Sequence, residues 1–351
     1  MNQINKPQHP QTLTECPNCK STLTEKHGKR KLKSGEKVQI YFCKNCRKFF
    51  TEKRIKGKHY NKKIILKAIS LYNLGYTAKE VVKKISISYK IKLPEQTLRK
   101  WLKDLKEICT FLKIRKRALK IDKNMIISKK LNHGQIYNFL LHKPKLEIRK
   151  DELPKEKLES LKKYLEFVQS EDFPHHIFTI EDEELNKRAS SIKAKLLDIE
   201  KLRKQNIANK LTELALMLVK NNRERHQVVQ NFMITNDSVT VACEIPVYLT
   251  KNDIKYFKNK NFVFDLENYR TPITGHIDIL QIRNGLVHIL DYKPCAEKVN
   301  AVNQLTIYAL ALASRTKLAV KDFKCAWFDE KNYFEFYPLQ GIYKTYQRIS
   351  I

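Results

Sequence analysis

The sequence has few glycines and no long apolar segment. Glycine accounts for only 8 of its 351 residues, whereas lysine, isoleucine and asparagine are abundant, a combination that suggests an AT-rich prokaryotic genome. No apolar run approaches the length of about 18 residues that a membrane-spanning helix needs, and we find neither a signal peptide nor an acylation motif. These absences argue against a membrane-bound or secreted protein, and we expect a cytoplasmic one.

Acidic residues are scarce relative to basic ones. The chain has 69 Lys and Arg against 37 Asp and Glu, which gives a formal net charge of +32 and a pI of about 9.7. A positive charge of this size is typical of proteins that bind nucleic acid. An anionic membrane surface is the competing partner, but the missing anchors disfavour it. We therefore expect DNA as the partner, no membrane association, and a nucleoid-associated state when DNA is bound.

Four of the eight cysteines form two C-x-x-C pairs. The pairs, CPNC and CKNC, enclose a basic segment with a Ser-Gly turn and the strand-like stretch VQIYF. Two such knuckles separated by a β-hairpin can present four thiolates tetrahedrally to a structural Zn²⁺ ion. No βαβ pattern of the thioredoxin type surrounds them, which disfavours redox pairs. We predict a zinc ribbon over residues 12–52, with its metal on Cys16, Cys19, Cys43 and Cys46.

A helical pattern follows after a basic linker. Gly75 breaks the periodicity, Thr77 and Glu80 form a T-x-x-E capping box, and Pro94 marks the start of another helix near Glu95. A short helix after a Gly turn, followed by a further helix, predicts a helix-turn-helix DNA-binding domain over residues 58–108. A helical spacer with a solvated basic face is the alternative.

In the last of these helices, packing and binding positions are expected to alternate. Leu98, Trp101 and Leu102 are expected to pack inward. Four polar residues are expected near the end that faces the DNA groove, namely Gln96, Thr97, Arg99 and Lys100.

The ribbon and helical unit together resemble the amino-terminal region of insertion-sequence transposases, in which such modules bind the ends of the element. This resemblance covers roughly residues 12–108 and implies DNA binding. Residues 109–204 are rich in lysine and are expected to form a mostly helical linker region with a hinge at KPKLEIRKDELPKEK. The adjacent His175 and His176 are expected at the surface rather than on a metal.

A β-hairpin is predicted in the stretch ITGHIDILQIRNGLVHILDYKP. Asn284-Gly285 supplies the positive φ angles that a two-residue type I′ turn needs. This turn pairs Arg283 with Leu286, and the same register places Asp278 opposite Asp291. Lys293, two residues further on, is expected on the same face.

Two acids opposed in this way need a compensating charge. Like charges directly across a strand pair are destabilising, and a divalent cation such as Mg²⁺ or Mn²⁺ would offset the repulsion. An adjacent ammonium group could then hold or polarise a phosphate oxygen. The alternative is a pair of solvated acids, but apolar residues share their face, which argues against exposure: Leu280, Ile282, Val287 and Ile289.

The rest of the carboxy-terminal region alternates between helical and strand patterns. We expect a long helix in IANKLTELALMLVKNN, strands in HQVVQNFMI and VTVACEIPVYL, the hairpin, a helix in VNQLTIYALALAS, and strands in FKCAWFD and YFEFYPL. This order indicates an α/β core. The chain as a whole is therefore expected to be multidomain.

The segments GHID, LDYKP and QLTIYALAL resemble the G-x-x-D, D-x-K and Q-x-x-x-Y motifs of the RecB-like branch of the PD-(D/E)XK nuclease superfamily. The resemblance covers about residues 205–340 and implies a restriction-endonuclease-like domain over residues 205–345. It implies that Asp278 and Asp291 bind Mg²⁺ or Mn²⁺ and that Lys293 orients or activates the attacking water. Gln304 and Tyr308, at i and i+4, would support the site or contact the DNA backbone. Ordinary helix packing is their alternative role.

The third metal ligand is less clearly marked. Members of this branch often have a metal-binding His on the preceding helix, and His226 is the nearest candidate, but it lies where we expect that helix to have ended. We favour Glu213 on the helix, with a solvated helix residue as the alternative. Glu244 would line the site or be a plain strand acid. The four remaining cysteines lack the downstream cluster of an iron–sulfur site and are expected to be buried thiols: Cys109, Cys243, Cys295 and Cys325.

These patterns favour a metal-dependent deoxyribonuclease that hydrolyses phosphodiester bonds and serves mobile-element, defence or repair processes. One alternative is a catalytically inactive DNA-binding regulator or transposon-end-binding protein. Another is a transposon-encoded cleavage subunit, which shares the chemistry. Because one such site cuts one strand, cleavage of both strands would indicate a homodimer.

Overall fold

The computed structural model describes residues 14–31, 37–51, 60–179, 188–266, 269 and 271–343. The chain divides into two compact units, one formed by residues 1–68 with 78–99 and the other by residues 69–77 with 100–351. No helix in the described ranges is long and apolar enough to cross a bilayer.

The smaller unit contains an antiparallel sheet of three strands, in the order β1 (Thr24–Lys31), β2 (Lys37–Cys43) and β3 (Phe49–Phe50). The helices that follow are α1 (Lys62–Asn73), α2 (Ala78–Tyr89) and α3 (Glu95–Leu105). The third helix begins at the residue that the sequence predicts. Its assignment to a helix-turn-helix domain stays a prediction.

The larger unit is built on an eight-stranded sheet, in the order β4-β5-β7-β8-β9-β10-β11-β6. Neighbouring strands are antiparallel except β9 and β10, which are parallel and are joined through helix α10. The mixed α/β core expected from the sequence is confirmed. The strands are β4 (Ile126–His133), β5 (Gln135–His142), β6 (Leu202–Lys204), β7 (Thr240–Leu249), β8 (Ile273–Arg283), β9 (Leu286–Tyr292), β10 (Phe323–Phe328) and β11 (Tyr333–Phe336).

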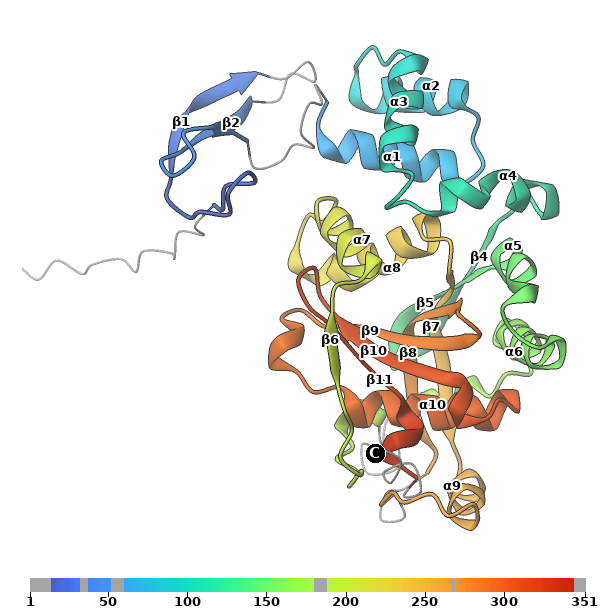
Figure 1. The fold of residues 1–351 in the computed structure, drawn as a ribbon. Helices are drawn as coiled ribbons and strands as arrows, with labels where there is room; N and C mark the ends of the chain where they lie inside the picture. The colour runs from blue at the N-terminus through green and yellow to red at the C-terminus, as the bar shows by residue number, and fades with distance from the viewer. Residues whose placement is uncertain are drawn as a thin grey trace, which may run out of the picture. The chain divides into compact units, whose positions relative to one another are not determined.

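Helices surround this sheet (Figure 1). Helix α10 packs against β7, β9 and β10, and α7 packs on α8, which contacts β7. Leu280, Val287 and Ile289 are fully buried in the same apolar core as Leu305 of α10, and burial of a side chain of this size stabilises the fold by about 1.5–3 kcal/mol. The helices are α4 (Phe111–Ile121), α5 (Lys143–Ile148), α6 (Lys155–Phe167), α7 (Ile207–Leu216), α8 (Arg225–Asn236), α9 (Lys251–Asn259) and α10 (Val302–Thr316).

Residues 109–204 do not form a helical linker. Strands β4, β5 and β6, which lie within this range, belong to the large sheet, and β5 pairs with β7 through Leu140 and Leu141. Strand β4 is an edge strand of the sheet, and its sequence, IISKKLNH, contains Lys129 and Lys130. Edge strands commonly carry lysine because it discourages pairing with another chain. The high lysine content of this stretch is therefore compatible with the edge strand β4 and does not indicate a linker.

The stretch HQVVQNFMI is a helix, not the expected strand. It forms most of α8, whereas the preceding helix α7 ends at Leu216 instead of continuing through KNN. Helix α8 is buried on most sides, including the polar residues Gln230 and Asn236. A helix buried all round lacks the 3.6-residue alternation that marks a surface helix, so the pattern was mistaken for that of a strand.

Candidate functional sites

The predicted hairpin turn and register are confirmed. Asn284 and Gly285 both have positive φ, 53° and 73°, and β8 pairs with β9 from Arg283↔Leu286 to Ile279↔Leu290. One step further, the register brings Asp278 beside Asp291. At this position the backbone pairing of β8 with β9 ends, and the Tyr292 backbone N–H donates instead to Asp278 Oδ2 at 3.1 Å.

Asp291 is the most confined carboxylate of the site. Its side chain is 2% exposed, and Lys293 Nζ lies 2.8 Å from its Oδ2. Its Oδ1 has no hydrogen-bond donor among the described residues. Burial, together with the charge of Asp278, raises the pKa of Asp291 well above its usual range, although Lys293 opposes this shift. Without a cation, this carboxyl group therefore takes up a proton more readily than a free aspartate does.

Glu244 adds a third carboxylate. The pairs Cys243↔Ile279 and Ile245↔Ile277 flank it, so the register places Glu244 next to Asp278 on the neighbouring strand. Its backbone has φ of +54°, which is unusual for a non-glycine residue. Burial and the charge of Asp278 raise the pKa of Glu244 to about 8, although Gln230 Nε2 donates to Oε1 at 2.6 Å.

His226, rather than Glu213, reaches the acids. His226 lies in the first turn of α8, with Nδ1 3.6 Å from Asp278 Oδ2, and its ring contacts Tyr292. Although burial opposes the shift, contacts with His226 and Asp291 lower the pKa of Asp278. Glu213 is exposed on α7 and does not line the cavity at the acids. The residues after α7 form a second helix, which brings His226 instead of Glu213 close to Asp278.

Gln304 and Tyr308, which the sequence places at i and i+4, contact each other on α10. Gln304 Nε2 donates to the Tyr308 hydroxyl at 2.9 Å. The Tyr308 ring lies directly against Gly275, where a Cβ atom would overlap the ring. Burial, followed by the charge of Asp291, raises the pKa of Tyr308. The glycine of GHID therefore allows α10 to present Tyr308 close to the acids.

A cavity of about 290 Å³ opens beside Asp278, Glu244, His226 and Tyr308. Its other wall is formed by the β4–β5 hairpin, by three residues between α6 and β6, and by the start of β8. These residues are His133, Gln135, Tyr137, Phe178, Arg188, Ser190, Thr274, Gly275 and His276. A larger hollow of about 780 Å³ lies between α9 and the end of α10, but none of the predicted residues lines it.

Three linked histidines form part of this wall, and two of them, His133 and His276, line the cavity. His133 Nδ1 lies 2.8 Å from His276 Nε2, and His133 Nε2 lies 2.9 Å from His175 Nδ1. The Tyr137 ring stacks on His276 with 3.6 Å between ring centroids. His175 was expected at the surface, but its Nε2 is buried. The interpretation of residues 109–204 as a linker misses this wall, although Ile136, Tyr137 and Phe139 in QIYNFLLH favour a strand.

Asp278, Asp291 and Glu244 are the acids that could hold a divalent cation, and two of them, Asp278 and Glu244, line the cavity. Burial and mutual repulsion raise the pKa values of Glu244 and Asp291, which disfavours a state in which all three acids are charged. A hard cation with oxygen ligands, such as Mg²⁺ or Mn²⁺, would remove that repulsion.

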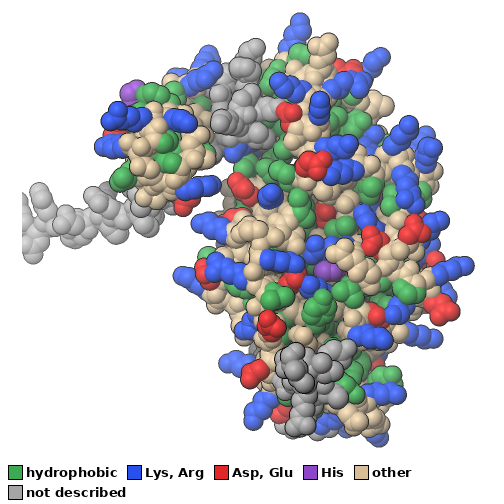
Figure 2. All heavy atoms as spheres, in the orientation of Figure 1, with side chains coloured by type: hydrophobic (Ala, Val, Ile, Leu, Met, Phe, Trp, Pro, Cys, Tyr) green, Lys and Arg blue, Asp and Glu red, His purple; other side chains and the backbone are tan. Residues whose placement is uncertain are grey.

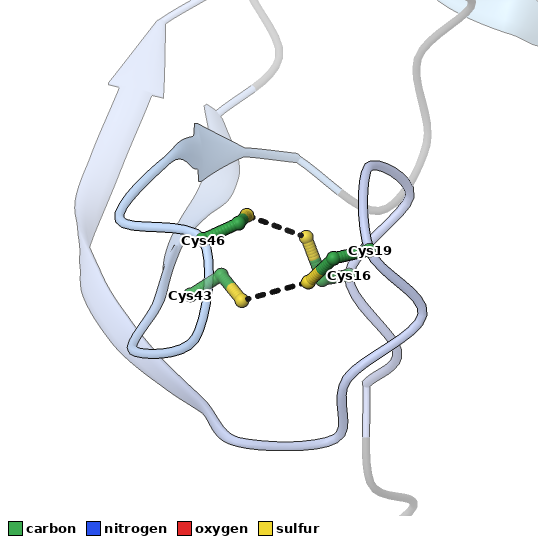
Figure 3. A group of neighbouring side chains, drawn as sticks. All are labelled: Cys16, Cys19, Cys43 and Cys46. Carbon is green, nitrogen blue, oxygen red and sulfur yellow. Dashed lines mark hydrogen bonds between the residues drawn. The ribbon is translucent and has the colours of Figure 1, made fainter.

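The four cysteines of the two C-x-x-C pairs form a second candidate metal centre (Figure 3). Cys16 Sγ lies 3.5 Å from Cys46 Sγ, and Cys19 Sγ lies 3.5 Å from Cys43 Sγ. All four sulfur atoms lie within 4.8 Å of one another. This cluster fits the zinc ribbon that the sequence predicts.

Both knuckles have the same backbone turn. The Lys20 N–H donates to Cys16 O and the Arg47 N–H donates to Cys43 O, each at 2.8 Å, and both donor residues have positive φ. The thiols differ in acidity. The Ser21 backbone N–H lowers the pKa of Cys19 to about 6, whereas burial and the neighbouring thiols raise the pKa of Cys46 to about 12. Four thiolates therefore need a cation to coexist.

The expectation of four further buried thiols is correct for three of them. Cys109, Cys243 and Cys325 are buried, but Cys295 is exposed. Cys295 follows Pro294 in a left-handed backbone conformation, with φ of 60°, so its side chain leaves the strand direction and points outward.

A family model described as the PD-(D/E)XK nuclease superfamily matches residues 139–336. This match covers more than half of the chain, which therefore belongs to that superfamily, whose members are generally metal-dependent nucleases. The match begins in β5, well before the boundary expected at residue 205. No curated protein and no solved structure matches the chain.

We expect one Zn²⁺ ion per chain on the cysteine cluster. Replacing Cys19 by Ser should abolish zinc binding and unfold the ribbon, because metal binding supplies about 10–16 kcal/mol in small zinc units. Elemental analysis and circular dichroism measure both effects. Cys295→Ser is the matched control and should retain the metal. The assignment is wrong if wild-type protein purified without chelator contains no zinc.

We also expect Asp291→Asn to stabilise the metal-free protein at neutral and higher pH. Because folding raises the pKa of Asp291, its ionisation costs stability, and this cost grows as pH rises from the usual pKa of 3.8 and is absent below it. The melting temperature should rise by about 2–4 °C for each kcal/mol of repulsion removed.

Thermal melts across pH, with and without Mn²⁺, test this expectation. The gain in melting temperature caused by Asp291→Asn should disappear near pH 4. Mn²⁺ should raise the melting temperature of the wild type but not that of the variant. Glu213→Gln, which changes an exposed carboxylate on α7, should have the melting temperature of the wild type both with and without Mn²⁺. A variant that Mn²⁺ stabilises as strongly as the wild type would contradict the proposed ligand role of Asp291.

Proposed function

We propose that this member of the superfamily is a Mg²⁺- or Mn²⁺-dependent deoxyribonuclease that hydrolyses phosphodiester bonds. The observation that carries the proposal is the buried Asp291, which lies beside Asp278 and forms an ion pair with Lys293. Asp278 and Asp291 would hold the cation, with Glu244 and His226 as candidates to complete the ligand set in place of Glu213. A cation held there supplies Lewis-acid stabilisation of the charge that develops on the phosphate.

Lys293 is suited to binding rather than to removing a proton. Although burial opposes the shift, the Asp291 carboxylate raises the pKa of Lys293, so its side chain stays an ammonium group. Its backbone is fixed by a hydrogen bond from its N–H to Phe328 O at 2.9 Å. An ammonium held in this way can donate to a phosphate oxygen and orient the attacking water. Gln304 and Tyr308 support the site from α10.

DNA is the proposed substrate, and the amino-terminal region is proposed to target it. Leu98 and Trp101 of α3 are buried, which supports the packing role expected for them. Gln96, Arg99 and Lys100 are exposed and Thr97 is half-buried, as direct contact with DNA requires. The net charge of +32 supports a polyanionic partner.

The biological setting is proposed on the same grounds. The combination of a DNA-binding region with a nuclease site suits mobile-element, defence or repair processes in a prokaryotic cytoplasm. A RecB-like relationship rests on GHID, LDYKP and QLTIYALAL, and a homodimer follows only if both strands are cut. A catalytically inactive binding protein is disfavoured because Asp278, Asp291 and Lys293 are all present and in contact.

A cleavage assay tests the proposal. Linear, circular, single-stranded and branched DNA should be incubated with Mg²⁺, Mn²⁺ or EDTA. Asp291→Ala should abolish cleavage, and Lys293→Ala should lower its rate by about 10²–10³-fold, as loss of one preorganised donor does, while retaining stabilisation by Mn²⁺.

Two further variants separate the candidates for the third ligand. His226→Ala should weaken cleavage, whereas Glu213→Ala, which removes an exposed carboxylate from the preceding helix, should not. The reverse result would restore Glu213 as the ligand. Undiminished cleavage by Asp291→Ala would refute the catalytic assignment.

For DNA targeting, we expect Arg99→Ala and Lys100→Ala each to reduce the affinity for DNA. Each should also lower the slope of log affinity against log salt concentration by about one. Lys103→Ala, an exposed position in the last turn of the same helix, is the matched control and should have a smaller effect. Binding to a labelled duplex should be measured by anisotropy from low to moderate salt. Equal effects of all three substitutions would indicate nonspecific charge instead of the predicted contact face.

A further inference from the structure

The small sheet of the cysteine-rich region carries aromatic side chains on its exposed surface. The Phe49 side chain is 56% exposed, although β2 and β3 pair it directly with Phe42. The two rings lie 4.9 Å apart between centroids, and the His27 ring lies 4.8 Å from Phe49. We name His27, Phe42 and Phe49 the aromatic face.

His27 lies on this face because it comes two residues after the β1 partner of Phe42, and a bulge in β1 begins beside it. The register between β1 and β2 shifts between Lys26 and Lys29, and Gly28 has φ of +78°. The bulge is held by Gln39, whose Nε2 donates to Gly28 O at 2.7 Å. Bulges of this kind redirect side chains at sheet edges.

Other aromatic residues of the same sheet pack differently. Tyr41 is buried and stacks on Phe50, with 5.6 Å between ring centroids. Tyr41 and Phe50 are the strand neighbours of Phe42 and Phe49, so alternation along the strands directs the two pairs to opposite faces. The aromatic face is therefore not required for the core of this sheet.

The charges around the aromatic face favour a polyanion. Residues 14–31 and 37–51 contain nine Lys and Arg against two acidic residues. One of the two acids, Glu25, is already paired with Lys44 at 3.0 Å. Figure 2 shows hydrophobic and basic side chains next to one another on this part of the protein.

We propose that the aromatic face binds single-stranded nucleic acid by stacking bases on its rings, while the surrounding Lys and Arg contact the phosphates. Sequence-tolerant binding of single strands combines these same two elements. A duplex keeps the faces of its bases stacked inside the helix and so cannot use the rings. This site is separate from the acids of the nuclease domain and from the predicted recognition residues of α3.

The test compares a strand with bases and a strand without them. Binding of the full-length protein to labelled oligothymidylate and to an abasic strand of equal length should be measured by anisotropy, without added Mg²⁺ or Mn²⁺. Phe49→Ala should weaken binding of oligothymidylate about fivefold or more and leave binding of the abasic strand unchanged. Phe49→Tyr should retain wild-type affinity because its ring can still stack.

Two controls define the result. Leu23→Ala removes another exposed apolar side chain of this region, 63% exposed, and should leave the affinities for oligothymidylate and for the abasic strand unchanged. The zinc content of each variant should equal that of the wild type. An equal loss on the abasic strand, or no loss on either strand, would overturn the proposal. Full rescue by Phe49→Leu, or an equal loss of binding to a polyglutamate peptide, would instead indicate an apolar docking site for an acidic protein.

Discussion

Repulsion between buried carboxylates is the constraint on which the nuclease site depends. Asp278, Asp291 and Glu244 come from three adjacent strands, and each is too enclosed for water to screen its charge fully. Isolated buried charges are costly enough that proteins usually neutralise them or pair them. Here Lys293 neutralises part of the charge, and under our proposal a divalent cation would neutralise the remainder. The stability of the metal-free site and its affinity for the metal would then be opposing consequences of the same arrangement.

The surrounding structure keeps these acids together. The type I′ turn at Asn284-Gly285 fixes the register of β8 against β9, and a shift by one residue would turn one carboxylate to the other side of the sheet. The pairing of β7 with β8 adds Glu244, and the parallel pairing of β9 with β10 secures the segment that carries Lys293. The chemistry thus depends on contacts between residues far apart in sequence.

The sequence predicted the hairpin, its register and the α/β core, because each rests on local patterns. It did not predict that β4 and β5 join the sheet, since lysine at an edge strand resembles a solvated linker. It also placed His226 in a strand, because α8 is buried on most sides and lacks helical amphipathicity. The histidine cluster depends on strand order, which periodicity in one chain does not specify, and for the same reason the sequence leaves Glu244 as either a site residue or a plain strand acid.

The contact between Gly275 and Tyr308 makes two sequence motifs into one structural unit. Because a methyl group at residue 275 would occupy the space of the tyrosine ring, the glycine of GHID and the tyrosine of QLTIYALAL cannot vary independently. A relative with a larger residue at the first position must have a smaller one at the second, or a helix that lies further from its sheet. Covariation at these two positions is thus a way to recognise this arrangement in sequences where the acids alone are ambiguous.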